Sequence, residues 1–422
     1  MSAATGSGKS VVIVGGGVIG LSAAYYALKS GHRVTVLERG GPDHQGCSLG
    51  NAGMIVPSHF VPLAAPGMVS LGLRMLLNRE SPFAIRPRLD PGLFRWGARF
   101  VRSANAAHVA RSAPLLRDLH LASRRAYEEL QQEIGGFGLV QRGLLMLCKT
   151  EKAFKEESHL AGEARSLGLS ADVLTPEDAA RVDPDARMDI AGAVHYAQDC
   201  HLSPGRLMAA LAAGVEHLGG DIRWKTEATG WRRTGDRIMA VRTGNDAIVA
   251  DDFVIAGGSW SPEIVRDLAI TLPIQAGKGY SITLPRPRQL PRLCSILVEA
   301  RVAVTPMGDS LRFGGTMEIG GLDLAINQRR VNGILKSIPR YFPEFRIADF
   351  AELPVWSGLR PCSPDGLPYI GRFGAYRNLV CATGHAMMGV SLAPVTGSLA
   401  ASILSEEPPS LDISLLSPDR YA

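Results

Sequence analysis

The sequence predicts an α/β fold built on a dinucleotide-binding domain of the Rossmann type. Three observations support this fold class: the β-branched run Val11 to Val14, the turn Gly15 to Gly20 directly after it, and a second strand, Arg33 to Glu38, that ends in a carboxylate. A continuous apolar run is typical of a parallel strand buried on both faces. The pattern G-x-G-x-x-G between strand and helix, with an acidic residue about twenty positions on, is the fingerprint of dinucleotide binding.

Each glycine of this turn has a separate predicted role. Gly15 permits the tight turn, Gly17 lets the backbone approach a pyrophosphate, and Gly20 lets the helix from Leu21 to Leu28 pack on the strand. The start of that helix faces the phosphate charge with its free amides. The predicted phosphate contacts are Gly15, Gly17, Val18, Ile19 and Gly20.

The second strand supplies the predicted sugar contact. Glu38 stands where a carboxylate holds the adenosine ribose, and Arg39 follows it. An upstream Gly8-Lys9-Ser10 resembles the end of a P-loop, but Ala3 stands where that motif requires glycine and no strand precedes it. We therefore assign the nucleotide to the Gly15 turn.

Length and composition exclude several classes. A chain of 422 residues exceeds one compact core, which predicts two domains. The net charge of +5 comes without a block of Lys and Arg, so no nucleic-acid partner is expected. Six scattered cysteines without a C-x-x-C pair predict no metal site and reduced thiols in a cytoplasmic location. The apolar run at Val11 is only four residues long, too short for a signal peptide or a membrane span.

Several further segments carry a family resemblance. They are residues 47–53 (CSLGNAG), 199–204 (DCHLSP), 256–260 (AGGSW), 356–361 (WSGLRP), 364–371 (PDGLPYIG), 382–385 (ATGH) and 389–394 (GVSLAP). Together they resemble the D-amino acid oxidase and dehydrogenase superfamily of FAD enzymes. The sequence is most similar to glycine oxidase and to bacterial D-amino acid dehydrogenases of the D-proline and hydroxy-D-proline type.

The resemblance implies a domain order. It implies a Rossmann-type FAD-binding domain interleaved with a mainly antiparallel substrate sheet, α+β overall. The expected FAD-binding segments are 1–138, 200–264 and 352–422, and the expected substrate segments are 139–199 and 265–351.

The resemblance also chooses the cofactor, which the glycine turn leaves open between FAD and NAD. It implies FAD, held noncovalently, because the offset of Cys362 from Asp365 does not fit the covalent members. The implied flavin contacts are Ser48, Gly50, Asn51, Ala52, Gly53, Gly257, Gly384, Met388, Gly389 and Val390. A helix running from Gly384 through Met388 to Leu404 is expected to direct its positive end at the flavin.

Three residues are implied in the chemistry. Arg360 matches an arginine that binds the substrate carboxylate through its planar fork. Tyr280 is expected near the substrate and His385 near the start of the C-terminal helix, although an aromatic strand residue or a lone histidine is as often a packing residue. The strand Arg301 to Pro306 lacks a tyrosine that glycine oxidase has there, so substrate recognition differs at that place.

The implied reaction is oxidation of a D-amino acid or cyclic D-imino acid, with D-proline or cis-4-hydroxy-D-proline preferred. The α-hydrogen leaves as hydride to the flavin, and an imine or keto acid results. Two alternatives stay open: a glycine- or sarcosine-type oxidase that uses O2, and a flavin-binding subunit of a multi-chain dehydrogenase. The expected electron acceptor is a quinone, the respiratory chain or O2.

A region of mixed character lies between Met68 and Phe100. It combines Leu, Met, Phe94 and Trp96 with several arginines. Helices packed under a basic face are the favoured interpretation, and peripheral contact with the inner face of a membrane is the alternative.

Overall fold

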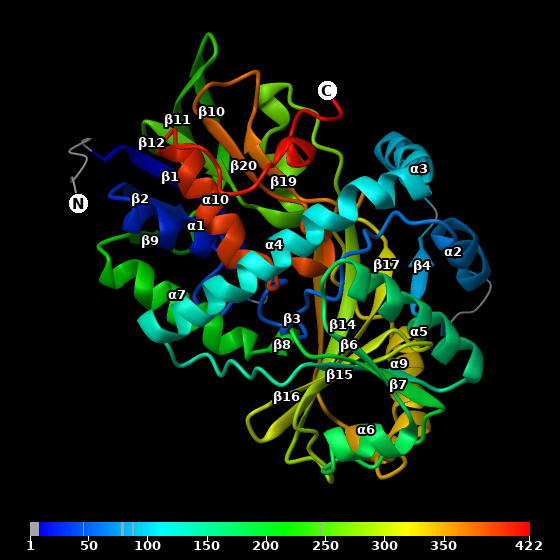
Figure 1. Cartoon of the computed structure of the whole chain (residues 1–422). Coiled ribbons are helices and arrows are strands. Elements are labelled where there is room, and N and C mark those ends of the chain that lie inside the picture. The colour runs from blue at the N-terminus through cyan, green and yellow to red at the C-terminus, as the bar shows by residue number, and fades with distance from the viewer. Residues whose placement is uncertain (1–7, 45, 77–79, 87, 245) are drawn as a thin grey trace.

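A six-stranded sheet, built from strands of both ends of the chain, forms the centre of one of the two layered parts of the molecule (Figure 1). The computed structural model describes residues 8–422 except 45, 77–79, 87 and 245. Within them the strand order is β19-β20-β13-β1-β2-β9. The bounds are β1 Ser10–Val14, β2 Arg33–Leu37, β9 Asp221–Arg223, β13 Asp252–Ile255, β19 Tyr369–Arg372 and β20 Leu379–Thr383. β1 is paired in parallel on both sides, with β13 and β2, as its apolar run predicts.

The two faces of β1 pack against different layers. Val11 and Ile13 contact the helical layer, and Val12 and Val14 contact the layer that contains the small sheet β10-β11-β12. The elements are α1 Val18–Lys29, α4 Ala106–Glu133, α7 Pro204–His217, α10 Ala393–Leu404, β10 Ala228–Thr234, β11 Arg237–Thr243 and β12 Asp246–Val249. This is the doubly covered parallel sheet expected of a Rossmann-type domain.

The C-terminal helix differs from its expected course. It was expected from Gly384, but α10 begins at Ala393, after a short 3-10 turn at Ala386–Met388. Gly384 and Ala386 have φ of +79° and +47°, which an α-helix cannot accommodate. Pro394 lacks the amide that an interior turn would use, so it fits only the first turn of the helix.

The second large sheet, to which nine of the described strands belong, lies beside the first (Figure 1). Its order is β18-β14-β17-β16-β15-β5-β7-β6, and β4 pairs with β17. The bounds are β4 Phe83–Ile85, β5 Leu144–Cys148, β6 Ala171–Leu174, β7 Gly192–Tyr196, β14 Gln275–Pro285, β15 Cys294–Leu297, β16 Val302–Met307, β17 Ser310–Ile319 and β18 Val355–Cys362. The helices that accompany it are α5 Glu151–Ser166, α6 Pro176–Val182 and α9 Gln328–Tyr341. Most neighbouring strands of this sheet are antiparallel, as the family resemblance implies.

The second sheet reaches beyond the segments expected for it. β18 follows residue 351 and β4 precedes residue 139, so both come from segments expected to belong to the FAD-binding domain. β18 pairs with β14 along eight residues, Arg360 included, and the chain passes to the first sheet between the end of β18 and the start of β19. A strand pair, β3 Met54–Ile55 with β8 Cys200–His201, lies apart from both large sheets.

The region from Met68 to Phe100 forms two short helices, α2 Met68–Leu76 and α3 Pro91–Ser103, with β4 between them. Trp96 is buried and its indole donates to the Cys362 carbonyl oxygen, whereas Phe94 is 64% exposed. Among the described residues, no helix combines the length and the apolar character needed to cross a bilayer.

Candidate active site

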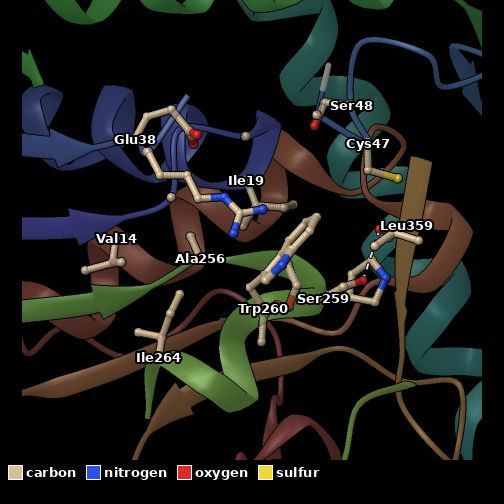
Figure 2. A pocket seen from close by; sticks show the side chains of 18 of the residues that line it. Val14, Ile19, Glu38, Cys47, Ser48, Ala256, Ser259, Trp260, Ile264 and Leu359 are labelled. Carbon is tan, nitrogen blue, oxygen red and sulfur yellow. Dashed lines mark hydrogen bonds between the residues drawn. The ribbon is translucent and has the colours of Figure 1, made fainter. Parts of the chain in front are cut away.

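A cavity of about 890 Å3 opens at the carboxyl ends of β1, β2 and β13, where parallel sheets of this kind bind their ligands (Figure 2). This volume is near the upper end of the roughly 300–1,000 Å3 of small-molecule sites. The predicted residues that line it are Gly15, Gly17, Val18, Ile19, Glu38, Arg39, Ser48, Asn51, Gly257, His385, Gly389 and Val390. Residues from the two ends of the chain thus meet around one space.

The glycine turn is fixed by close backbone approaches. Gly15 has φ of +117°, and a Cβ on it would collide with the Ala256 carbonyl group of the neighbouring strand. A Cβ on Gly20 would collide with the Gly15 carbonyl oxygen, so the start of α1 can lie this close to β1 only with glycine there. Both glycines therefore have the steric roles that the fingerprint assigns.

The first turn of α1 is a site for an anion. Gly17 caps the helix without a side chain, and no acidic residue lies in its first turn. The hydroxyl of Ser48 accepts a hydrogen bond from the Val18 amide at 3.0 Å. This amide and its neighbours face the cavity, and a helix start of this kind favours phosphate.

Glu38 is held rigidly at the wall of the cavity. Its Oε2 accepts from the Gly16 amide at 2.8 Å, and its Oε1 accepts from the Gly40 amide at 2.7 Å. Because each carboxylate oxygen has a second lone pair, both can also accept from the hydroxyls of a ribose. Glu38 is therefore placed where it could hold a ribose, and this contact stays a prediction.

Ser259 and Trp260 also line the cavity, and the sequence analysis did not predict either as a cofactor contact. The guanidinium of Arg39 lies 3.9 Å from the ring centre of Trp260, and Ser259 donates to the Leu359 carbonyl oxygen at 3.1 Å. In Figure 2, Trp260 and Ser259 lie on the side of Ile19 away from Glu38. The segment 227–230 also lines the cavity, and nothing in its sequence marks it as a binding segment.

Arg360 lies where the two sheets meet. Its neighbours Leu359 and Pro361 line the cavity, and its Nη1 donates to the Thr316 carbonyl oxygen at 2.6 Å. Among the described residues, no carboxylate lies within ion-pair distance of its guanidinium. Burial raises the pKa of Cys47, and the charge of Arg360 opposes that rise, so the guanidinium acts on a residue of the cavity wall. A half-buried cation without a counter-ion is suited to bind a carboxylate.

His385 lines the cavity as a neutral side chain. It is 3% exposed, and its Nε2 lies 2.9 Å from the Thr396 hydroxyl. Burial lowers its pKa to about 3, so the imidazole carries no charge near neutral pH. An isolated bridge also pairs His385 with Cys362, which links the Arg360 strand to the 384–390 segment.

Tyr280 is placed differently from its prediction. It is 1% exposed, and its hydroxyl accepts from the Asn327 amide at 3.2 Å. Successive residues of a strand point to opposite faces, and Arg360 lies over Gly279. Tyr280 thus faces the other side of the sheet from Arg360, which corrects the predicted substrate contact.

The remaining predicted cofactor residues shape the surroundings without lining the cavity. Gly20 touches Gly15, Gly50 lies against the Trp356 indole, Ala52 faces Gly314, Gly53 turns with φ of +74° beside Leu202, Gly384 lies against Tyr369, and Met388 packs between two apolar clusters. The contacts observed here are packing contacts, and a role of these residues in holding the cofactor stays a prediction.

Arg312 is a further residue that the sequence prediction missed. Its Nη1 donates to the carbonyl oxygens of Leu49 at 2.9 Å and Asn51 at 2.8 Å, and its Nε donates to the Thr283 hydroxyl at 3.0 Å. Burial lowers its pKa, because the desolvated cation is compensated only by dipoles. Arg312 thereby fixes the loop 47–53, which was predicted to contact the flavin, to the second sheet.

Comparison with known proteins agrees with this geometry. The family model described as "FAD dependent oxidoreductase" matches residues 10–403. A D-amino acid dehydrogenase of Methylobacterium radiotolerans is 34% identical over 98% of this chain and 99% of the relative, and one of Granulibacter bethesdensis is 32% identical with the same coverage. Among solved structures, glycine oxidase from Geobacillus kaustophilus superposes with a TM-score of 0.79 at 25% identity, covering 99% of this chain and all of that chain.

The chain therefore belongs to the family of FAD-dependent oxidoreductases. The L-proline dehydrogenase of P. horikoshii, 19% identical with a TM-score of 0.73 over 98% of each chain, shares the fold. The residues present fit FAD: the start of α1 for the pyrophosphate, Glu38 for the ribose, and the space between Ser259 and Val390 for the remainder. Among the described residues, no group of three or more His, Cys, Asp or Glu side chains could hold a metal ion.

Proposed function

We propose that this protein is a dehydrogenase that oxidises D-amino acids or cyclic D-imino acids at the α-carbon. The observation that carries the proposal is Arg360, a cation without a carboxylate partner among the described residues, which lies in the chain between two residues that line the FAD cavity. The names of the 34% and 32% identical relatives support the same substrate class.

The chain's own residues bind and orient the substrate. Arg360 has five N–H donors, and one N–H of Nη1 binds the Thr316 carbonyl oxygen. The other donors can hold the substrate carboxylate in two hydrogen bonds. FAD, when bound, supplies the acceptor for the hydride of the α-carbon. His385 is neutral at the cavity wall, so it does not repel the amine and holds no proton that the amine would have to displace. We infer that the amine binds uncharged.

The preferred substrate is D-proline or cis-4-hydroxy-D-proline. This preference rests on the resemblance of residues 50–57 to dehydrogenases of imino acids. Oxidation of such a ring leaves a cyclic imine, whereas a primary amine gives an imine that hydrolyses to a keto acid.

One experiment tests substrate and acceptor together. The purified chain is mixed without oxygen with D-proline, cis-4-hydroxy-D-proline, D-alanine, their L-enantiomers, glycine and sarcosine, and the flavin absorbance is followed. Bleaching by D-substrates alone supports the proposal, and bleaching by glycine or sarcosine alone contradicts it. Rapid recovery of the colour in air identifies an oxidase, whereas slow recovery that a quinone accelerates identifies a dehydrogenase.

The second candidate is a glycine- or sarcosine-type oxidase that uses O2. The similarity to the Geobacillus kaustophilus glycine oxidase favours it. A flavin-binding subunit is the third, and the same experiment separates it: such a subunit would hold FAD but turn over no substrate until another chain is added.

We also propose a route for the electron acceptor. A second cavity of about 530 Å3 shares Ser259, Glu263 and Arg266 with the first. Its other basic residues, Arg88, Arg95 and Arg99, come from the α3 region, where Leu89 and Phe94 are exposed. A basic and apolar face suits peripheral contact with an anionic membrane. Co-sedimentation with anionic but not neutral vesicles, lost in a Phe94→Ser variant, tests this contact.

A further inference from the structure

The guanidinium of Arg360, the proposed carboxylate anchor, packs against the backbone of Gly279 on the neighbouring strand β14. In the register of β14 and β18, Gly277 is opposite Arg360 and Gly279 is opposite Gly358. A Cβ built on Gly279 would collide at nearly equal distances with Cζ, Nη1 and Nη2 of Arg360. Equal approach to these three atoms means that the flat guanidinium lies face-on over Gly279.

Gly358, which is opposite Gly279 on β18, is also covered by a side chain, the indole of Trp356. A Cβ on Gly358 would collide with the six-membered ring of Trp356, and a Cβ on Gly50 would collide with the same indole. The guanidinium and the indole thus lie side by side on a pair of cross-strand glycines, and the flavin-contact loop closes over the indole. This leaves the outward edge of Arg360 bordered by an aromatic wall.

A β-bulge in β17 provides a second contact for Arg360, a hydrogen bond to the Thr316 carbonyl oxygen. The ladder between β14 and β17 shifts register between Lys278 and Tyr280, so Thr316 lies in a bulge opposite Gly279. Thr316 has φ of +70°, which is rare for a β-branched residue and is kept where the surrounding structure demands it. Its carbonyl oxygen accepts from Nη1 of Arg360 at 2.6 Å, so the bulge directs this oxygen at the guanidinium.

We propose that Gly279 is a positioning residue for Arg360: it is the one place on β14 where a missing side chain lets the guanidinium lie flat and reach Thr316, with its free donors directed at the substrate. This inference rests on the proposed role of Arg360 as the carboxylate anchor. Gly279 has no left-handed φ, so the backbone there would accept any residue, and the space for the guanidinium is the reason for glycine.

The substitution Gly279→Ala tests the inference without threatening the fold. The colliding atoms are the far end of a flexible side chain, so the methyl group displaces the guanidinium while the strand remains. We expect a carboxylate ligand, either the best D-amino acid or the unreactive probe benzoate, to bind roughly tenfold to a hundredfold more weakly by calorimetry. Flavin content and the melting temperature are expected to remain at wild-type values.

Gly314→Ala is the matched control. Gly314 belongs to the neighbouring strand β17, and a Cβ there would meet only ordinary contacts at 3.8 Å or more. It is expected to leave carboxylate affinity unchanged. A loss of affinity equal to that of Gly279→Ala would indicate a general effect on the sheet and overturn the inference.

A double-mutant cycle separates this inference from the proposed function. In an Arg360→Leu background, Gly279→Ala is expected to cause no further loss, because its effect passes through the guanidinium. Wild-type affinity in Gly279→Ala, or a full additional loss in the double variant, overturns the role of Gly279. If Arg360→Leu alone leaves carboxylate affinity unchanged, the proposed function fails, and that result is read independently of Gly279.

Discussion

The hydroxyl of Ser48 accepts a hydrogen bond from the amide of Val18 at 3.0 Å, so a residue of the flavin-contact loop caps the helix that follows the glycine turn. Gly17 is the N-cap residue itself, and Ser48 accepts from the first turn as an N-cap side chain would, an interaction that contributes about 0.5–2 kcal/mol to stability. We expect Ser48→Ala to lower the melting temperature of the apoprotein. The loss should be smaller with FAD bound, since a phosphate at the start of α1 also accepts from these amides.

Ser203→Ala is the control for this prediction. Ser203 stands at the N-cap of α7 without a side-chain hydrogen bond to the helix. Thermal unfolding of both variants, with and without FAD, makes the comparison. An equal shift in the two variants would argue against the capping role of Ser48.

Arg360→Leu is expected to retain flavin and to lose its response to carboxylate substrates. Removing one charged hydrogen-bonding partner costs about 1.5–3 kcal/mol for each bond, which corresponds to a rise of at least about tenfold in KM. Steady-state kinetics and the flavin spectrum measure the two effects. Arg233→Leu, at an exposed arginine of β10, serves as the control and should leave both unchanged.

Arg312→Met is expected to weaken FAD binding. Without the guanidinium, the carbonyl oxygens of Leu49 and Asn51 lose their shared donor, and the loop that lines the cavity is released from β17. Flavin content after gel filtration, and the Kd of the apoprotein for FAD, measure the effect. Arg312→Lys should recover only part of it, because an ammonium lacks the planar fork of arginine. Normal FAD affinity in Arg312→Met would refute the anchoring role.

Asp199 predicts a pH dependence of stability. Its carboxyl is 1% exposed, accepts hydrogen bonds from the amide and hydroxyl of Ser58, and has its pKa raised by burial from 3.8 to about 7. The folded state therefore binds a proton more tightly than the unfolded state. The contribution is fully present below pH 4 and is lost as pH rises through about 7.

The variant Asp199→Asn tests this sign. We expect wild-type stability, measured by chemical unfolding, to fall relative to the variant between pH 5 and pH 8. A difference that stays constant across this interval, or a wild-type stability that rises relative to the variant as the pH increases, would contradict the raised pKa.

His385 is expected to have no part in the pH profile of the reaction. Its pKa of about 3 keeps it neutral throughout the working range. His385→Gln, which can preserve a hydrogen bond to Thr396, should leave the shape of the kcat/KM profile unchanged even if its height falls. The disappearance of an ionisation near neutral pH in the variant would show that His385 titrates there.

The local parts of the fold were predictable from the sequence. The strand, turn and helix from Ser10 to Lys29 are determined by residues close together in the sequence. Only glycine fits at Gly15 and Gly20, so the motif can be recognised from the sequence. The loop around Asn51 and the position of Arg360 followed from resemblance. Both lie at the cavity or its edge.

The face of a strand and the course of a turn were not predictable in the same way. Tyr280 and Gly279 are adjacent, and only the pairing of β14 with β18, together with the bulge at Thr316, decides which of them meets Arg360. The start of α10 depends on the left-handed backbone at Ala386, a residue that rarely adopts it. The role of Arg312 could not be predicted, because it depends on tertiary contacts with the carbonyl oxygens of Leu49 and Asn51, which are distant in sequence.

The order of strands in the first sheet has a consequence for biosynthesis. β20, which pairs with β13, lies far along the chain from β1, and β18, which carries Arg360, precedes β20 only shortly. Contacts between such distant segments slow folding, because the intervening chain must close a long loop. Both walls of the FAD cavity therefore come together only after β20 has left the ribosome, and the nascent chain has no finished place for the cofactor before then.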